Sequence, residues 1–193
     1  GTLTAGSRPF FDNTYPGETD SNAGFIYDGL PFFDTAHTIS GGSGTYANHV
    51  VSSALSQANL QTALTAMTKT NAVNERGERV LIQPTHLMVP PGLEYTAKVI
   101  LQSAQATGGN NNDINPIAGT LQLMVNRALD DAASASSWWL VTSGQSLRVI
   151  DSGAPRLRTV VLPNGDVEVI AEFEYGAGVK NWRYSYCANK AAS

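Results

Sequence analysis

The chain has 193 residues, of which 42% are hydrophobic and only 15% charged, with a formal net charge of −4. This length and apolar content suffice for one domain, or a domain with a subdomain, and exclude a disordered chain. The acidic balance argues against an electrostatic nucleic-acid binder, and no apolar run of about 18 residues is present to span a membrane. Because charged residues fall well below the roughly 25% of a typical soluble chain, we expect a weakly charged surface that associates with copies of itself.

Residues 1–54 are rich in Gly, Ser, Thr and Asn and are interrupted by prolines, which predicts irregular structure with short strands. The stretch 41–48 is predicted to be a flexible tip because of its glycines. Aromatic side chains recur in this segment and need burial, so we expect them to anchor it to a surface. They are Phe10, Phe11, Tyr15, Phe25, Tyr27, Phe32, Phe33 and Tyr46.

Two helices are predicted next. Residues 55–70 repeat apolar side chains at helical spacing, and Ser56 or Asn59 can cap the start. A second helix is expected at about 91–105, since Pro91 suits a first helical turn and an apolar stripe follows it. The apolar face of the first helix consists of Leu60, Ala63, Leu64 and Met67.

Short apolar runs at 80–82 and 87–89 predict short strands between the helices, and a polar loop at 107–116 is interpreted as a surface loop or subunit contact. From residue 119 onward the chain is strand-rich, so the order of elements predicts an α+β fold rather than repeated βαβ units. The Asn-Gly pair in 163–166 predicts a hairpin turn. Strands are expected at 121–125, 138–141, 147–150, 157–162, 167–175 and 179–187.

The strand at 167–175 alternates apolar residues with mostly acidic ones, which predicts one buried face and one acidic face. We expect Gly176 and Gly178 to end it. In the following run, Trp182, Tyr184 and Tyr186 recur at period two.

No constellation of residues indicates catalysis or metal binding. His37, His49 and His86 show none of the spacings of a metal site, and His37 and His49 are interpreted as held by local turn hydrogen bonds. The stretch 144–148 is not a nucleophile elbow, and the lone Cys187 is interpreted as a small buried hydrophobe. Asp130 and Asp131 are interpreted as a helix or turn cap. We therefore expect no enzyme activity and assign no catalytic, cofactor-binding or metal-ligating residue and no cofactor.

The segment 27-YDGLPFFDTAHT-38, followed by Asn48, resembles a motif of tailed-bacteriophage major capsid proteins, in particular the Mu-like major head subunit family. The resemblance continues in order and spacing over most of the remaining chain. Further matching segments are 55–69, Arg76–Gly77, 83–103, 112–115, 129–140 and 175–186.

This resemblance implies a Hong Kong 97-type fold with a peripheral and an axial domain, here apparently without the N-terminal arm, extended loop and spine helix. By the family pattern, residues 1–54 belong to the peripheral domain, 55–150 mainly to the axial domain, and 151–193 return to the peripheral domain. The implied function is a structural subunit that forms hexamers and pentamers of an icosahedral shell around double-stranded DNA. A non-enzymatic virion decoration or binding module is the alternative.

The implied partners are copies of the subunit itself, with scaffold, portal or decoration proteins as further candidates, and neither a membrane nor sequence-specific DNA. The implied location is the virion capsid, which is assembled in the cytoplasm of a bacterial host. A prophage is an implied source of the gene. Candidate contacts between subunits are the loop 107–116, the tip 41–48, and the acidic face of 168–174 against Arg156 or Arg158 of a neighbour. The N-terminal sequence GTLTAGSRPFF has no signal-peptide pattern, and the single cysteine fits a reduced, intracellular site of synthesis.

Overall fold

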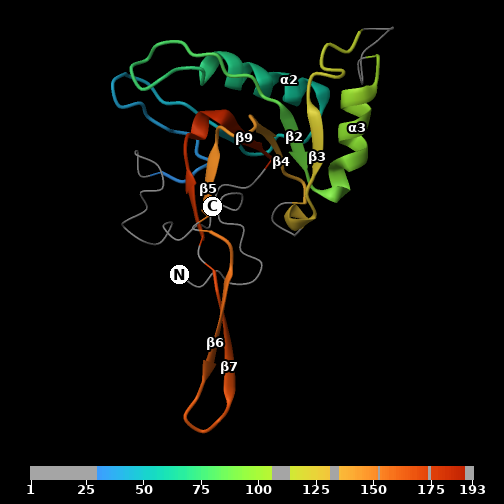
Figure 1. Ribbon diagram of the computed structural model, residues 1–193. Coiled ribbons are helices and arrows are strands. Elements are labelled where there is room, and N and C mark those ends of the chain that lie inside the picture. Colours follow the sequence, from blue (N-terminus) through green and yellow to red (C-terminus); the bar gives the residue numbers. More distant parts are fainter. Residues whose placement is uncertain (1–29, 106–113, 131–134, 152, 174, 190–193) are drawn as a thin grey trace.

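The computed structural model describes residues 30–105, 114–130, 135–151, 153–173 and 175–189 (Figure 1). Its centre is a mixed five-stranded sheet in the order β1-β9-β4-β2-β3. The outer pairs β1–β9 and β2–β3 are parallel, and the inner pairs β2–β4 and β4–β9 are antiparallel. The predicted α+β class is confirmed at this level. The strands are β1 (His49–Val50), β2 (His86–Val89), β3 (Gln122–Val125), β4 (Trp138–Val141) and β9 (Ser185–Ala188).

The first predicted helix is confirmed. It consists of α2 (Gln57–Thr65), continued by a π-helical turn at Ala66–Thr70. The Ser56 side chain caps its start by accepting a hydrogen bond from the backbone N–H of Asn59, at 3.2 Å. The side chains buried on its inner face are Leu60, Ala63 and Met67.

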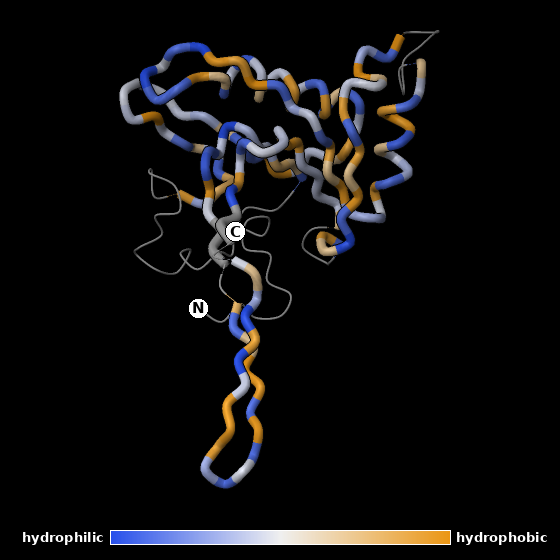
Figure 2. The backbone as a smooth tube through the Cα atoms, viewed as in Figure 1, coloured by the Kyte–Doolittle hydropathy of each residue, from blue (hydrophilic) through white to orange (hydrophobic). Residues whose placement is uncertain are grey.

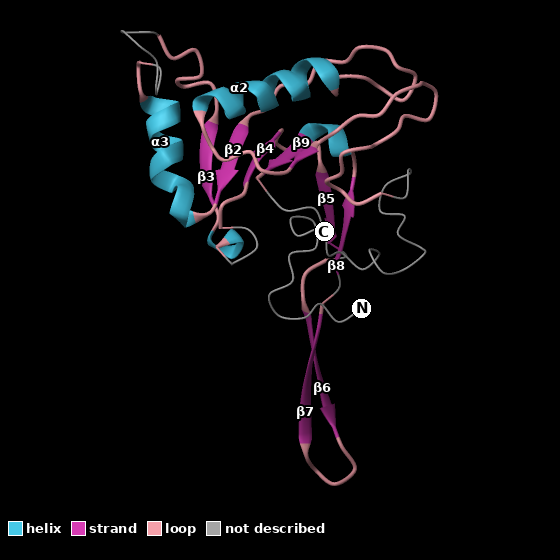
Figure 3. Cartoon of the chain, turned by 180° about the vertical axis from the view of Figure 1, so that it is seen from behind, coloured by secondary structure: helices cyan, strands magenta, loops and turns pink. Residues whose placement is uncertain are grey.

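The second predicted helix is also confirmed, as a 3₁₀ turn at Pro91–Leu93 that leads into α3 (Glu94–Gln102). Figures 1 and 3 show α3 alongside β3 at the edge of the sheet. The buried stripe of α3 consists of Ala97, Ile100 and Leu101.

The sheet separates two apolar cores, because side chains alternate between its faces. In β4, Trp138 and Leu140 pack with α2 and α3, whereas Trp139 faces the opposite core. The helix-side core also contains Leu87, Val89 and Tyr186. The opposite core consists of Phe32, Phe33, Met88, Leu129, Trp139, Trp182 and Cys187.

Two short antiparallel ladders complete the strand-rich end, β5 with β8 and β6 with β7. Gly176 and Gly178 do not end a strand as predicted. Both lie inside β8, opposite Ile150 and Arg148 of β5, because ladder hydrogen bonds need only the backbone. The bounds are β5 (Leu147–Asp151), β6 (Arg156–Val161), β7 (Val167–Glu172) and β8 (Tyr175–Val179).

Two other strand predictions are wrong in part. The run 80–82 is not a strand, although Ile82 is buried. In the run 179–187, Trp182–Tyr184 forms a 3₁₀ turn and only the last residues enter β9. The reason is local, since the Asn181 side chain accepts a hydrogen bond from the backbone N–H of Arg183 at 3.0 Å and starts a turn.

Candidate assembly surface

The most exposed element of the described chain is the β6–β7 hairpin, which projects away from the sheet and helices (Figures 1 and 3). Its turn contains the predicted Asn-Gly pair, and the glycine of this pair, Gly165, lies in the left-handed region at φ +87°. The cross-strand register runs from Arg156 opposite Glu172 to Val161 opposite Val167. Because side chains alternate along a strand, this register gives the hairpin two chemically different faces.

One face is apolar. It is formed by three cross-strand pairs, and we call these six residues the apolar hairpin face: Leu157 with Ala171, Thr159 with Val169, and Val161 with Val167. All six are exposed, and the exposed fractions of Leu157 and Val169 are 76% and 65%. Figure 2 shows that hydrophobic positions recur along the hairpin. The prediction of a buried apolar face at 167–175 is therefore wrong for this isolated chain, because nothing among the described residues covers it.

The other face carries the charges, with Val160 and Ile170 half-buried between them. Arg158 and Glu172 form an ion pair of 3.4 Å within the hairpin, and both side chains are more than half exposed. This pair lies within one chain, and the expected contact of the acidic strand with Arg156 or Arg158 of a neighbour stays a prediction.

The base of the β5–β8 ladder, which leads to the hairpin, is fixed to the sheet through Ser146. Its backbone carbonyl accepts hydrogen bonds from the backbone N–H groups of Lys180 and Asn181, at 2.8 and 3.2 Å. Its hydroxyl accepts one from the Ser185 hydroxyl at 2.7 Å, and both serines are buried. The hairpin and the β5–β8 ladder therefore leave the sheet after β4 and return to it directly before β9.

Beside this base lies a buried cluster around Trp182. The His37 ring stacks on the Trp182 indole, with centroids 4.3 Å apart and planes at 14°. His37 Nε2 lies 3.1 Å from Oδ1 of Asn48, an atom that only accepts. The Asn48 amide group donates to the carbonyls of Phe32 at 2.8 Å and Trp182 at 3.2 Å. Sequence reasoning found Asn48 only as part of a motif, and its structural role follows from these contacts.

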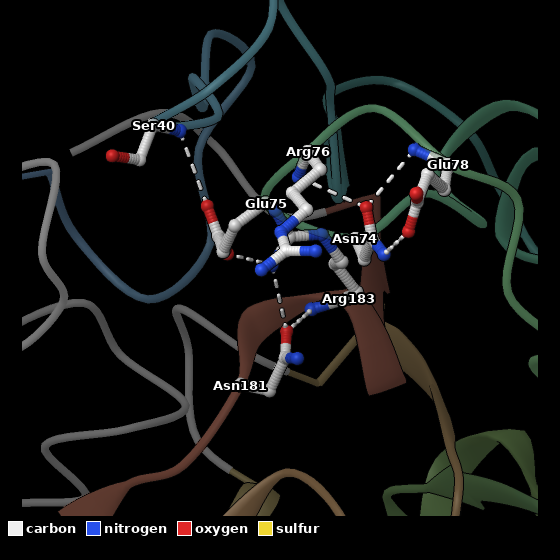
Figure 4. Close-up of polar contacts among 7 residues, drawn as sticks. All are labelled: Ser40, Asn74, Glu75, Arg76, Glu78, Asn181 and Arg183. Carbon is white, nitrogen blue, oxygen red and sulfur yellow. Dashed lines mark hydrogen bonds and ion pairs between the residues drawn. The ribbon is translucent and has the colours of Figure 1, made fainter.

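Arg183 continues the cluster and was missed as a buried residue. It is 3% exposed, and its Nη1 lies 2.7 Å from Oε1 of Glu75 (Figure 4). The other carboxylate oxygen of Glu75 accepts from the backbone N–H of Ser40 at 3.2 Å. The guanidinium also lies over the Trp182 ring, 4.6 Å from its centroid. These contacts join three distant segments of the chain on one side of the sheet.

The stretch 41–48 is not the free tip that its composition predicted. His37 and Tyr46 exchange two backbone hydrogen bonds, at 2.9 and 2.8 Å, and the Gly41 N–H donates to the Glu75 carbonyl at 2.7 Å. Asn48 at its end is fully buried. Only the short turn between these fixed points is exposed and available for contact.

Most of the predicted contact loop 107–116 lies outside the described residues, which resume at Ile114. The side chain of Ile114 is 84% exposed. The next residue, Asn115, is buried, and its amide group donates to the carbonyl of Ile100 at 2.6 Å. The end of this loop is therefore fixed to α3 while presenting an apolar side chain outward.

The other residues weighed as catalytic or metal-binding candidates lie in strands and turns. His49 is buried in β1, and His86 Nδ1 lies 2.7 Å from the Thr85 hydroxyl. Cys187 is a fully buried thiol, as predicted. Asp130 ends a 3₁₀ turn, as expected of a cap, and Asp131 lies outside the described residues. Over the described ranges, no three His, Cys, Asp or Glu side chains are grouped to hold a metal ion.

A pocket of about 470 Å³ opens beside β3, and every residue that lines it is uncharged. The lining residues are Thr68, Gln83, Pro84, Thr85, Gly119, Thr120, Leu121 and Gln122.

Burial raises the pKa of the Tyr186 phenol above its usual 10.0, and the adjacent Cys187 thiol raises it further. None of the helices in the described ranges is long and apolar enough to cross a membrane.

Comparison with known proteins identifies the family of the chain. A search of curated protein sequences returns no match. Among solved structures, the chain is similar to a virus-like particle protein from Pyrococcus furiosus, with 13% sequence identity and a TM-score of 0.36. The match covers 68% of this chain and 51% of that one, so this chain aligns with about half of that protein's length. The family model described as phage capsid protein matches residues 18–188. Since this match spans most of the sequence, the chain belongs to the phage capsid protein family, whose members are structural subunits that self-assemble.

Proposed function

We propose that this protein is a major head subunit of the Hong Kong 97 type, of the Mu-like group, which forms hexamers and pentamers of an icosahedral shell around double-stranded DNA. The observation that carries the proposal is the phage capsid family match over residues 18–188. The weakly charged composition supports it, since a subunit surrounded by copies of itself buries much of its nominal surface.

The distribution of exposed apolar side chains supports head-to-tail packing. One group lies on the hairpin, and another lies on α3 and β3, at the other end of the molecule (Figure 1). Two different surfaces that meet between neighbours make a heterologous interface, which closes into rings when the rotation permits. The group on α3 and β3 consists of Tyr95, Met124 and Val125, which are 80%, 46% and 37% exposed.

In this proposal, residues 55–150 form most of the axial domain, and 1–54 and 151–193 contribute to the peripheral domain. The strands β1 and β9 from these flanking segments complete the central sheet. Scaffold, portal or decoration proteins are further proposed partners, and assembly takes place in the cytoplasm of a bacterial host. The net charge of −4 fits a shell that encloses DNA without binding its phosphates tightly.

Size-exclusion chromatography and negative-stain electron microscopy of the purified chain test the proposal. We expect rings or closed shells, and we expect particles made in bacteria to protect double-stranded DNA from nuclease. A chain that stays monomeric at high concentration would contradict the proposal and favour a decoration or binding module.

A further inference from the structure

We propose that the apolar hairpin face docks on a second copy of this chain and is buried there in the assembled particle. This inference rests on the proposed function for its partner, and it adds the surface by which one copy holds the next.

The first support is the exposure of the face. Val161 and Val167 form a cross-strand pair next to the turn, yet they are 69% and 62% exposed. Continuous apolar surface of this kind on a soluble chain marks an interaction site, whereas isolated exposed apolar residues need no explanation. The three pairs of the apolar hairpin face are consecutive on one side of the ladder and therefore form one stripe.

The second support is the isolation of the hairpin. A two-stranded hairpin alone in water is marginal, because it has no third element to bury an apolar face. Within the described ranges, β6 and β7 pair only with each other. Burial against another surface would supply the stabilisation that this ladder lacks.

The third support is the difference between the two faces. The charged face has its own ion pair, Arg158 with Glu172, and carries two basic and two acidic side chains. It therefore needs no oppositely charged partner and has no excess positive charge that would favour an anionic membrane. The apolar hairpin face is the side that gains from leaving water. In a family whose members self-assemble, the surface that lies next to each hairpin in high copy number is another subunit.

The test compares two double variants of the same hairpin. Val161→Thr with Val169→Thr changes only the apolar hairpin face, and threonine keeps the shape and strand preference of valine. Val160→Thr with Ile170→Thr is the matched control on the charged face. We expect the apolar-face variant to raise the protein concentration needed for assembly by at least about tenfold, since each added hydroxyl loses its water on docking. We expect the control to change it by less than about twofold.

Photocrosslinking keeps the proposal testable if either variant folds poorly. A benzophenone amino acid replaces Val169 or, as the control, Glu168, in an equal mixture of ¹⁴N- and ¹⁵N-labelled chains. Crosslinked peptides of mixed label are expected for position 169 and should be several-fold fewer for position 168. Crosslinks confined to single-label peptides would show that the face is covered by its own chain and would overturn the inference.

The outcomes separate the inference from the proposed function. If the wild-type chain forms no assemblies, the proposed function fails and this inference fails with it. If the wild type assembles, but the apolar-face variant assembles at an unchanged concentration, the inference alone fails.

Discussion

The guanidinium of Arg183 lies 2.7 Å from the Glu75 carboxylate, although the two residues are far apart in the sequence and Arg183 is 3% exposed. The ion pair connects two turns, the one around Glu75 that follows the α2 segment and the 3₁₀ turn Trp182–Tyr184 that precedes β9. A buried cation without its partner is costly, so this contact fixes where the two turns meet.

Removing Glu75 should therefore destabilise the fold. We expect Glu75→Ala to lower the free energy of unfolding by about 1–3 kcal/mol, less than for a fully buried pair because the Glu75 side chain is 46% exposed. Glu94→Ala is the control, since its 2.6 Å pair with Lys98 is exposed and of the i,i+4 kind. It should cost about 0.5 kcal/mol or less in the same urea titration. Equal losses for both variants would contradict the structural role of the Arg183 contact.

Gly41 should not accept a side chain. A Cβ atom there would lie 2.8 Å from the Glu75 carbonyl oxygen, in the place where the Gly41 N–H makes its hydrogen bond. Gly41→Ala should lower the free energy of unfolding by about 1–3 kcal/mol. At Gly92 the nearest atom would be 4.0 Å away, so Gly92→Ala should change stability by less than about 0.5 kcal/mol. Thermal unfolding of the two variants side by side checks the difference.

Asn48 should not be replaceable by aspartate. Its amide nitrogen faces the carbonyls of Phe32 and Trp182, and a carboxylate would place negative oxygen against both. At neutral pH, Asn48→Asp should cost at least about 3 kcal/mol, because two buried acceptors lose their donor and gain a repelling charge.

Asn126→Asp provides the control for this substitution. The Asn126 side chain accepts from the Ala128 N–H at 3.0 Å, and aspartate is an equally good cap. Wild-type denaturation midpoints for both variants would refute the role assigned to the Asn48 amide.

The raised pKa of Tyr186 predicts a loss of stability at high pH. Above about pH 10 the phenol in the unfolded chain gives up its proton while the buried phenol keeps it. The unfolded state then binds fewer protons, so the free energy of unfolding falls as pH rises toward the pKa of the folded state. Burial is the larger cause and the neighbouring Cys187 the smaller one.

Urea titrations between pH 9 and pH 11 measure this slope. Tyr186→Phe should reduce it, while Tyr95→Phe, at an 80% exposed position, should keep the wild-type slope. An unchanged slope in Tyr186→Phe would mean that the phenol titrates alike in the folded and unfolded chains.

The helices and β4 could be predicted because their signals are local. The spacing of Leu60, Ala63 and Met67 defines a helix face, and the run from Trp138 to Val141 is apolar on both sides, as a strand between two cores must be. Gly178 shows the limit of such reasoning, since its strand depends on pairing with Arg148. The burial of Arg183 was equally hidden, because it depends on Glu75 and the Trp182 ring rather than on its neighbours in sequence.

For the candidate assembly surface, the sequence showed an alternation at 167–175 and a turn at 163–166; the turn is present, and the alternating strand is present as β7, which ends at Glu172. It could not show which face of the hairpin the other described residues leave uncovered. That outcome depends on where the backbone directs the hairpin, and contacts such as Ser146 with Ser185 fix the base of the β5–β8 ladder that leads to it. An apolar face looks the same in sequence whether its own chain or another molecule covers it.

The position of β9 has a consequence for biosynthesis. This strand enters the sheet between β1 and β4, so His49 meets Cys187 only after the chain through β9 has left the ribosome. A nascent chain that stops before residue 185 lacks an inner strand and leaves β1 without its partner. The order of strands therefore couples formation of the central sheet to synthesis of β9, because a chain whose synthesis stops before this strand lacks the link between β1 and β4.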